Sequence, residues 1–265
     1  MMKEIEVGSA AQLISAFNEL PNNFIFRGHA DSSWPLASTL ERVVGNRWSA
    51  DHAKKFEEFS LTEFRPKFHL YDRENVQPKS KLAWLSIMQH YGVPTRLLDF
   101  TESPFVALYF ALESYDPQSH TDLAVFAIDY SATMDNSLEH IALRDADFRE
   151  TRATVHDKQD FVFDTIVDHL NYDVAWIAEP NQLNARLDRQ AGSFLLSGNR
   201  GNRIQDVLIS QTYSGVRMFK FRISYTLYSS LFGLLRKMNI TSKSLYGDLG
   251  GLARSIRMQM QYFAA

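Results

Sequence analysis

The polar side chains best placed for chemistry lie in one loop between two apolar segments, inside the stretch from Leu82 to Ser114. Imidazole, guanidinium, carboxylate and hydroxyl groups all occur there: His90, Arg96, Asp99, Thr101, Glu102 and Ser103. Such groups are costly to bury unless other groups or a ligand satisfy them. Packing alone would not gather them between two apolar helices, so we interpret the loop as the floor of a site.

A second candidate is Arg27, which follows the apolar run Phe24–Phe26 and precedes Gly28. Three β-favouring residues predict a short buried strand that ends in one guanidinium group. The planar guanidinium binds phosphate through paired hydrogen bonds, and a glycine beside it permits close approach. A phosphate-binding role and a structural ion pair with a buried acid such as Asp99 explain Arg27 equally well.

Three further positions have both a functional and a structural explanation. His90 could move protons, although a histidine at the C-terminus of a helix more often caps the last carbonyl groups. The segment Thr101–Ser103 offers hydroxyls and free N–H groups that suit an anion or ribose, although every helix start benefits from a hydroxyl. Arg186 and Gln190 share a helix face at i, i+4 and could grip a carbonyl-bearing ring or an acidic partner, with solvent exposure as the default.

The sequence does not indicate a metal site or a common nucleotide-binding or hydrolase motif. The eight histidines are scattered without HExxH-like spacing, and no cysteine is present to supply a thiolate. The chain also lacks a Walker loop, a GxGxxG sequence and a GxSxG sequence. We therefore expect no metal cofactor.

The composition is that of a soluble globular protein. Of its 265 residues 45% are hydrophobic, which is enough to bury a sizeable core. The absence of cysteine removes any need for an oxidising compartment, and the N-terminus lacks the pattern of a secretory signal. The longest apolar segments are shorter than a membrane span. We expect a cytoplasmic protein with no membrane partner.

The charge balance does not favour nucleic acid as a partner of the whole chain, because 28 basic residues face 31 acidic ones. Basic residues are nevertheless concentrated in one third of the sequence: Arg186, Arg189, Arg200, Arg203, Arg217, Lys220 and Arg222. A local nucleic-acid groove stays open as an alternative, and a solvated charged face is the more ordinary explanation.

The order of helical and strand patterns predicts a single α+β domain over residues 1–265, in which many helices flank a mixed β-sheet. Helices are predicted at residues 9–20, 39–44, 49–71, 80–91, 104–112, 160–170, 180–190, 225–238 and 242–258. Strands are predicted at residues 24–28, 96–100, 123–128, 174–178, 193–196 and 216–223. Pro66 is expected to kink or break its helix, and residues 129–150 to form a surface excursion with at most one short helix.

Four sequence blocks resemble the FRG domain family, named for its Phe/Tyr-Arg-Gly element. They are FIFRG at 24–28, HYGVPTRLLDFTESPFVALYFA at 90–111, PNQLNARLDRQAGSF at 180–194 and SKSLYGDLGGLAR at 242–254. The likeness extends from about Phe24 to about Ala253 and implies a single FRG domain. It implies little about function, because the family is described mainly by sequence.

A second likeness, to ADP-ribosyltransferases of the Arg-Ser-Glu type, suggests chemistry. It rests on the aromatic-Arg-Gly strand and on the later Phe-Thr-x-Ser element that leads into a helix. The resemblance implies an ADP-ribosyltransferase-like fold with NAD as the substrate. It places Arg27 at the diphosphate or ribose, and Thr101 and Ser103 in the floor of the site. The remaining residues expected around NAD are Gly28, His90, Arg96, Asp99 and Arg186.

The same resemblance leaves the catalytic charge unassigned. Enzymes of this type use a late glutamate to support an oxocarbenium-like transition state, a role that requires a fixed negative charge. The corresponding region here contains Gln190, with Glu179 before it. An amide can hold ribose but supplies no charge, so Glu179 or Glu102 would have to do so.

Two functions follow as alternatives. In the first, the chain is an NAD-dependent ADP-ribosyltransferase or NAD glycohydrolase-like enzyme of bacterial defence or toxin biology, and passes ADP-ribose to water or to a macromolecule. In the second, it is a nucleotide- or nucleic-acid-recognising module, or a nuclease, without NAD chemistry. Both require that Arg27 and the turn near Thr101 line one shared hollow.

Overall fold

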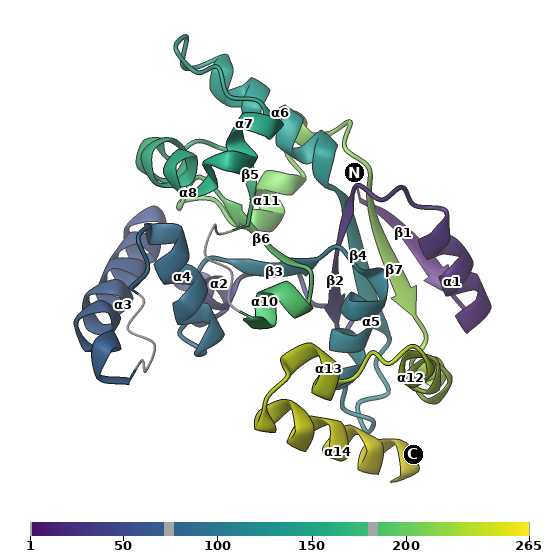
Figure 1. Ribbon diagram of the computed structural model, residues 1–265. Coiled ribbons are helices and arrows are strands. Elements are labelled where there is room, and N and C mark those ends of the chain that lie inside the picture. The colour runs from purple at the N-terminus through teal and green to yellow at the C-terminus, as the bar shows by residue number, and fades with distance from the viewer. Residues whose placement is uncertain (1, 72–76, 180–184, 265) are drawn as a thin grey trace.

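The computed structural model describes residues 2–71, 77–179 and 185–264. Within these ranges seven strands form one sheet in the order β1-β7-β4-β2-β3-β6-β5, with helices packed on both faces (Figure 1). β1 and β7 are parallel, and the other neighbouring strands are antiparallel. The predicted α+β fold with a mixed sheet is confirmed.

Six of the seven described strands lie where the sequence predicts them. The strands are β1 (Lys3–Val7), β2 (Phe24–His29), β3 (Leu98–Thr101), β4 (Leu123–Asp129), β5 (Ala175–Ala178), β6 (Gly192–Ser197) and β7 (Met218–Ile223). β1 was missed because it is an edge strand rich in charge, with Val7 as its one buried residue. An exposed edge strand carries little hydrophobic pattern that a sequence could reveal.

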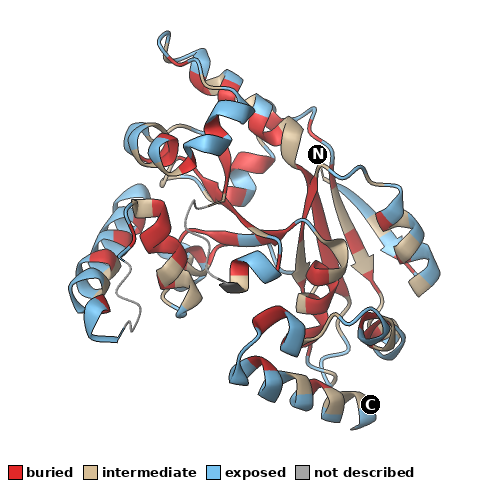
Figure 2. Cartoon of the chain, viewed as in Figure 1, coloured by how far each residue is buried: buried red, intermediate tan, exposed pale blue. Residues whose placement is uncertain are grey.

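β4 shows how the sheet separates two hydrophobic cores. All its residues are buried, and side chains alternate between the two faces of a strand (Figure 2). One core receives Ala124, Phe126 and Ile128, and the other receives Leu123, Val125 and Ala127. A strand that is apolar on both faces must lie between two layers of helices.

The helices divide between these two cores. The first core contains residues of α3 (Ala50–Tyr71), α4 (Lys81–His90), α6 (Tyr130–Ala142), α7 (Arg152–Asp157), α8 (Gln159–Val162), α10 (Ala185–Arg189) and α11 (Ile204–Leu208). The second contains residues of α1 (Ala10–Asn18), α5 (Pro104–Glu113), α12 (Tyr228–Lys237), α13 (Ser242–Tyr246) and α14 (Leu249–Ala264). The short helices α2 (Thr39–Val44) and α9 (Asp168–Leu170) complete the set. In the described ranges, none of the helices combines the length and the apolar character that a membrane crossing requires.

Local signals explain why α4 and α5 flank the loop that carries the candidate residues. The α5 helix begins after Ser103, whose Oγ accepts a hydrogen bond from the Val106 backbone N–H at 3.3 Å, and Pro104 occupies the first turn. Gly92 follows α4 with φ of 83°, a conformation that glycine adopts without strain. These predicted ends fix the length of the intervening loop.

Two helix predictions need correction. Residues 129–150 contain a full helix, α6, which Asp129 caps and which buries Met134, Leu138 and Ile141. The predicted helix 242–258 is two helices, because Gly247 has φ of 68° and ends α13. Of the kink or break predicted at Pro66, the break is absent, because α3 continues through this residue. The predicted helix start at residues 180–184 lies outside the described residues.

Gly28 serves helix packing rather than the approach of a ligand. A Cβ at this position would lie 1.9 Å from the carbonyl oxygen of Ala107 and 2.8 Å from the backbone nitrogen of Ala111. Both atoms belong to the backbone of α5, which therefore crosses β2 at a distance that only glycine allows. The expected ligand-binding role of Gly28 is thus unnecessary to explain the residue, although Gly28 does border the cavity described below.

Substitution of Gly28 by alanine is expected to destabilise the fold by about 1–3 kcal/mol, since two backbones would have to separate. Gly233→Ala is the matched control, because it lies within α12 and an added Cβ would meet nothing within 4 Å. That change should stabilise the chain by about 0.5–1 kcal/mol. Urea unfolding of both variants measures the difference, and a Gly28→Ala chain of unchanged stability would contradict the packing explanation.

Candidate functional site

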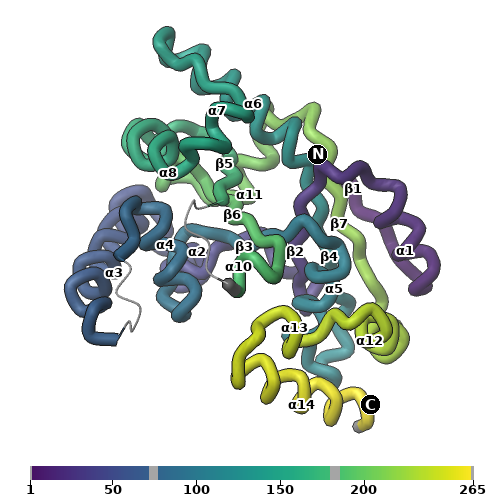
Figure 3. Tube along the Cα trace, in the orientation of Figure 1, coloured from purple at the N-terminus to yellow at the C-terminus, as the bar shows by residue number. Residues whose placement is uncertain are grey.

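A cavity of about 310 Å³ opens between the sheet and five helices. β2 and β3 form its floor, α4 and α10 contribute on one side, and α5, α13 and α14 on the other. Figure 3 shows the C-terminal helices returning beside α5 and α10, two elements that lie much earlier in the sequence. The volume lies at the lower end of the range for ligand pockets.

Most of the predicted site residues line this one cavity. They are Arg27, Gly28, His90, Asp99, Thr101, Arg186 and Gln190. β2, β3 and β6 are neighbours in the sheet, with Phe26 opposite Thr101 and Thr101 opposite Gly192. The condition that Arg27 and the turn near Thr101 share a hollow is therefore met.

Arg27 is held by two contacts that leave part of its guanidinium available. Its Nε donates to Nε2 of His29 at 3.0 Å, and its Nη1 donates to the backbone oxygen of Asp99 at 2.7 Å. The Asp99 carboxylate is 3.9 Å away and its side chain is 61% exposed, so the two residues do not form a buried ion pair. Nη2 has no hydrogen-bond partner among the described residues.

The electrostatic environment of Arg27 favours an anionic ligand. Burial lowers the pKa of Arg27 to about 10, and the Asp99 charge offsets this only in part. Burial, together with the nearby Arg27 charge, lowers the pKa of His29 to about 3, so its imidazole is neutral and can accept the Arg27 hydrogen bond. Burial and the Arg186 charge also lower the pKa of His90. A desolvated and weakly compensated cation gains free energy when an anion binds.

The opposite wall is organised around Tyr246. The guanidinium carbons of Arg186 and Arg254 each lie 4.5 Å from the centroid of its ring. The Tyr246 hydroxyl donates to Oε2 of Glu113 at 2.6 Å, and burial raises the pKa of that hydroxyl. Oε1 of the same carboxylate accepts from Tyr109 at 3.1 Å and Ser242 at 3.2 Å. Glu113 is therefore fixed in place by three hydroxyl groups.

Thr101 and Gln190 are joined at the floor of the cavity. Oγ1 of Thr101 donates to the backbone oxygen of Gln190 at 2.6 Å and accepts from the Ser103 backbone N–H at 3.1 Å. The Gln190 side chain donates to the Leu245 carbonyl at 3.4 Å. Thr101 thus links the end of β3 to the turn before β6. This link is consistent with the predicted structural role of Thr101 in the floor of the site.

Three of the other predicted residues do not line the cavity. Ser103 caps α5, and Glu102 is exposed beyond the end of β3. Glu179 follows β5, and its backbone N–H donates to the Gln159 side chain at 2.8 Å. Burial and the Glu102 charge raise the pKa of Glu179. β3 and β5 run in the same direction, so Glu102 and Glu179 lie at the same end of the sheet, where both strands finish. Neither glutamate lines the cavity.

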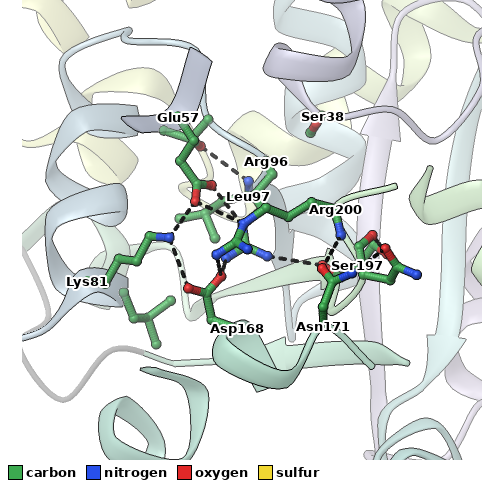
Figure 4. A network of polar contacts seen from close by, with 12 residues as sticks. Ser38, Glu57, Lys81, Arg96, Leu97, Asp168, Asn171, Ser197 and Arg200 are labelled. Carbon is green, nitrogen blue, oxygen red and sulfur yellow. Dashed lines mark hydrogen bonds and ion pairs between the residues drawn. The ribbon is translucent and has the colours of Figure 1, made fainter. Parts of the chain in front are cut away.

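Arg96 was expected at the same site and instead belongs to a buried ion cluster, here called the Arg96 cluster (Figure 4). It consists of Glu57, Lys81, Arg96, Asp168 and Arg200. Nε of Arg96 donates to Glu57 at 2.8 Å, and its Nη2 donates to Asp168. The cluster joins α3, α4 and α9 to the loops before β3 and after β6. Arg96 therefore holds the scaffold together at a distance from the cavity.

The basic side chains between residues 200 and 222 contact acidic partners or backbone. Arg217 pairs with Asp129 at 2.9 Å, and Lys220 pairs with Glu4 at 3.0 Å. Arg222 lies within ion-pair distance of three carboxylates, those of Glu4, Glu6 and Asp122. Arg200 belongs to the Arg96 cluster, and Arg203 donates to the Gly45 carbonyl. These contacts neutralise much of the positive charge that a nucleic-acid groove would need.

Several residues of the cavity were not predicted from the sequence, among them Ser86, Glu113, Tyr246 and Arg254. Ser86 and Glu113 lie inside apolar helical patterns, where a single polar residue gives no signal of a site. Tyr246 and Arg254 belong to the C-terminal block, far from Arg27 in sequence. In the described ranges no three histidine, aspartate or glutamate side chains are grouped as metal ligands.

Comparison with known proteins identifies a family. The model of the FRG domain family matches residues 22–120. No curated protein and no solved structure matches the chain. The matched segment extends from β2 to α5 and supplies Arg27, His90, Asp99 and Thr101, whereas α10, α13 and α14 lie outside it. These comparisons contain nothing that bears on NAD or on ADP-ribosylation.

Proposed function

Because the chain contains an FRG domain whose matched segment forms the floor of the cavity, we propose that this cavity binds NAD and that the chain cleaves the nicotinamide–ribose bond. The supporting observation is Arg27, a half-buried guanidinium whose Nη2 has no hydrogen-bond partner among the described residues, at the wall of a cavity that Thr101 and Gln190 also line. ADP-ribose would pass to water or to a macromolecular acceptor. A role in bacterial defence or as a toxin would suit such an activity.

The charges around the cavity support a ligand that carries phosphate. Three guanidinium groups line it, those of Arg27, Arg186 and Arg254. The two carboxylates that line it among the described residues are Asp99 and Glu113, and Glu113 already accepts hydrogen bonds from three hydroxyls. Guanidinium groups bind phosphate oxygens with paired, charge-assisted hydrogen bonds. In the proposed complex Arg27 binds the diphosphate.

Bond cleavage at the ribose requires a negative charge that is not already neutralised. Glu102 and Glu179 do not line the cavity, so we assign this role to Asp99. Its side chain is 61% exposed, and its only charged contact among the described residues is Arg27 at 3.9 Å. Asp99 and Thr101 lie on the same face of β3, because residues two apart in a strand point the same way.

The test is the release of nicotinamide when the purified chain is incubated with NAD. Asp99→Asn should lower this rate by at least about 100-fold, as loss of a transition-state charge does, while NAD still binds. Glu102→Gln and Glu179→Gln are the matched controls and should retain the unaltered chain's rate. Absence of nicotinamide release from the unaltered chain would contradict NAD cleavage.

One observation favours a second function, in which the cavity binds a nucleotide without cleaving it. The position that resembles the catalytic glutamate of ADP-ribosyltransferases contains Gln190, whose amide is occupied by the Leu245 carbonyl. An amide gives a ribose hydrogen bonds but no charge. Calorimetry with NAD, ADP-ribose and ATP distinguishes the two functions, since tight binding of any of them without cleavage would support the second.

A further inference from the structure

We propose that Ser86 is a specificity residue that recognises the carboxamide of the nicotinamide ring, an inference that rests on the function proposed above. Ser86 lies in the middle of α4 and is 2% exposed. Ser86 lines the cavity, and its hydroxyl is buried without a hydrogen-bond partner among the described residues. Of the buried side-chain atoms that lack a partner there, Oγ of Ser86 is the one whose residue lines the cavity.

An unsatisfied buried hydroxyl is unusual and needs an explanation. Buried polar groups in folded proteins nearly always have a partner, and a helical serine commonly bonds to the carbonyl one turn earlier. Ser137, a buried serine of α6, does so: its Oγ donates to the Thr133 carbonyl at 2.8 Å and contacts the Ala175 carbonyl at 2.7 Å. Ser86 makes no such contact, and its position on the cavity wall indicates that the missing partner is a ligand.

The surroundings of Ser86 indicate the kind of group it would meet. The cavity residues Phe100, Leu187 and Phe194 belong to the same hydrophobic core as the α4 residues Leu85 and Met88. Tyr246, which contacts Arg186 and Arg254 on the opposite wall, belongs to the second hydrophobic core. We assign the ring of the ligand to the apolar end of the cavity formed by Phe100, Leu187 and Phe194, because a flat ring packs on apolar side chains better than a phosphate does.

A hydroxyl both donates and accepts, so its best partner offers an acceptor and a donor together. The carboxamide of nicotinamide has a carbonyl oxygen and an NH₂ group on an aromatic ring. In the proposed complex the ring packs against the apolar end and its amide meets Oγ of Ser86, while the diphosphate binds Arg27. His90 lies one helical turn after Ser86 and lines the same wall.

The experiment compares Ser86→Ala with Ser193→Ala. Ser193 is the matched control because it is 1% exposed and its Oγ also lacks a partner, but it does not line the cavity. Without ligand, both variants should be at least as stable as the unaltered chain, since each removes an unsatisfied buried hydroxyl. Ser86→Ala should bind NAD and nicotinamide about tenfold more weakly, which corresponds to the loss of one hydrogen bond. Its affinity for ADP-ribose, which has no carboxamide, should not change, and Ser193→Ala should bind all three ligands normally.

Isothermal calorimetry with the three ligands and thermal unfolding without ligand distinguish the outcomes. If Ser86→Ala binds NAD as tightly as the unaltered chain, or loses ADP-ribose affinity equally, the inference about Ser86 is wrong and the proposed function still stands. If Ser86→Ala lowers the melting temperature by several degrees while Ser193→Ala does not, Ser86 has a structural partner and the inference is also wrong. If the unaltered chain binds neither NAD nor ADP-ribose, the proposed function fails and the carboxamide assignment fails with it.

Discussion

Replacement of Arg27 by methionine is expected to weaken NAD binding by at least about 100-fold and to abolish nicotinamide release, because the diphosphate loses its charge-assisted hydrogen bonds. The stability of the fold should change little. The Arg27 side chain is half-buried at the cavity wall and its pKa is lowered to about 10, so folding disfavours its charged form. Methionine retains most of the volume and removes that desolvated charge.

The stability of this variant separates a functional Arg27 from a structural one. Loss of the hydrogen bonds to His29 and to the Asp99 backbone opposes the gain from removing the charge, so the free energy of unfolding should change by about 1 kcal/mol or less. Loss of one partner of a buried ion pair would instead cost about 3–5 kcal/mol. Arg152→Met, at an exposed ion pair with Asp135, is the control for both measurements. A large loss of stability with NAD binding intact would show that Arg27 is structural.

Asp168→Asn should cause the largest loss of stability among the substitutions considered, about 3–5 kcal/mol by urea unfolding. The Asp168 carboxylate contacts Lys81 at 2.9 Å, Arg200 at 2.5 Å and Arg96, and it is almost fully buried. Asparagine preserves its shape but leaves three cations around the single carboxylate of Glu57. Asp135→Asn is the matched control, since its exposed pair with Arg152 contributes about 0–1 kcal/mol. Equal, small effects of the two substitutions would show that the Arg96 cluster is not an essential support.

The same cluster predicts how stability depends on pH. Burial alone would raise the pKa values of Glu57 and Asp168, but the Arg96 and Lys81 charges lower them below 4.5 and 3.8, respectively. A carboxyl group with a lowered pKa stabilises the folded state fully above its unfolded pKa, and that contribution is lost as the pH falls through the folded pKa. The unaltered chain should therefore lose stability below about pH 4.5, and Asp168→Asn should lose less over the same interval. Parallel curves for the two proteins would contradict this assignment.

Sequence reasoning succeeded where the signal was local. The apolar run before Arg27 predicted β2, the Ser103-Pro104 pair predicted the start of α5, and the run Leu123–Ile128 predicted β4. Each of these depends on a few adjacent side chains that are buried or that cap a helix. β1 and α6 escaped because an edge strand of charged residues and a helix within a polar segment carry weak patterns.

The sequence did not show which arginine lines the cavity and which belongs to a buried ion cluster. Arg27 lies near the end of β2 and Arg96 just before β3, each beside a polar loop. These similar sequence contexts do not indicate which of the two has a binding role. The structure gives Arg96 two buried carboxylates and leaves Arg27 with backbone, imidazole and an exposed carboxylate. The difference arises from Glu57 on α3 and Asp168 on α9, which only the packing of those helices against the loop brings near.

The sequence alone determined the helices and strands with strong patterns, the α+β class, and the small set of residues from which a cavity could be built, because these depend on neighbouring side chains. The tertiary structure decided which residues share the cavity, which charges cancel, and that Ser86 and Tyr246 contribute to it. Those outcomes depend on sheet order and on the return of α13 and α14 to α5, contacts between residues far apart in the chain that leave no trace in any single segment.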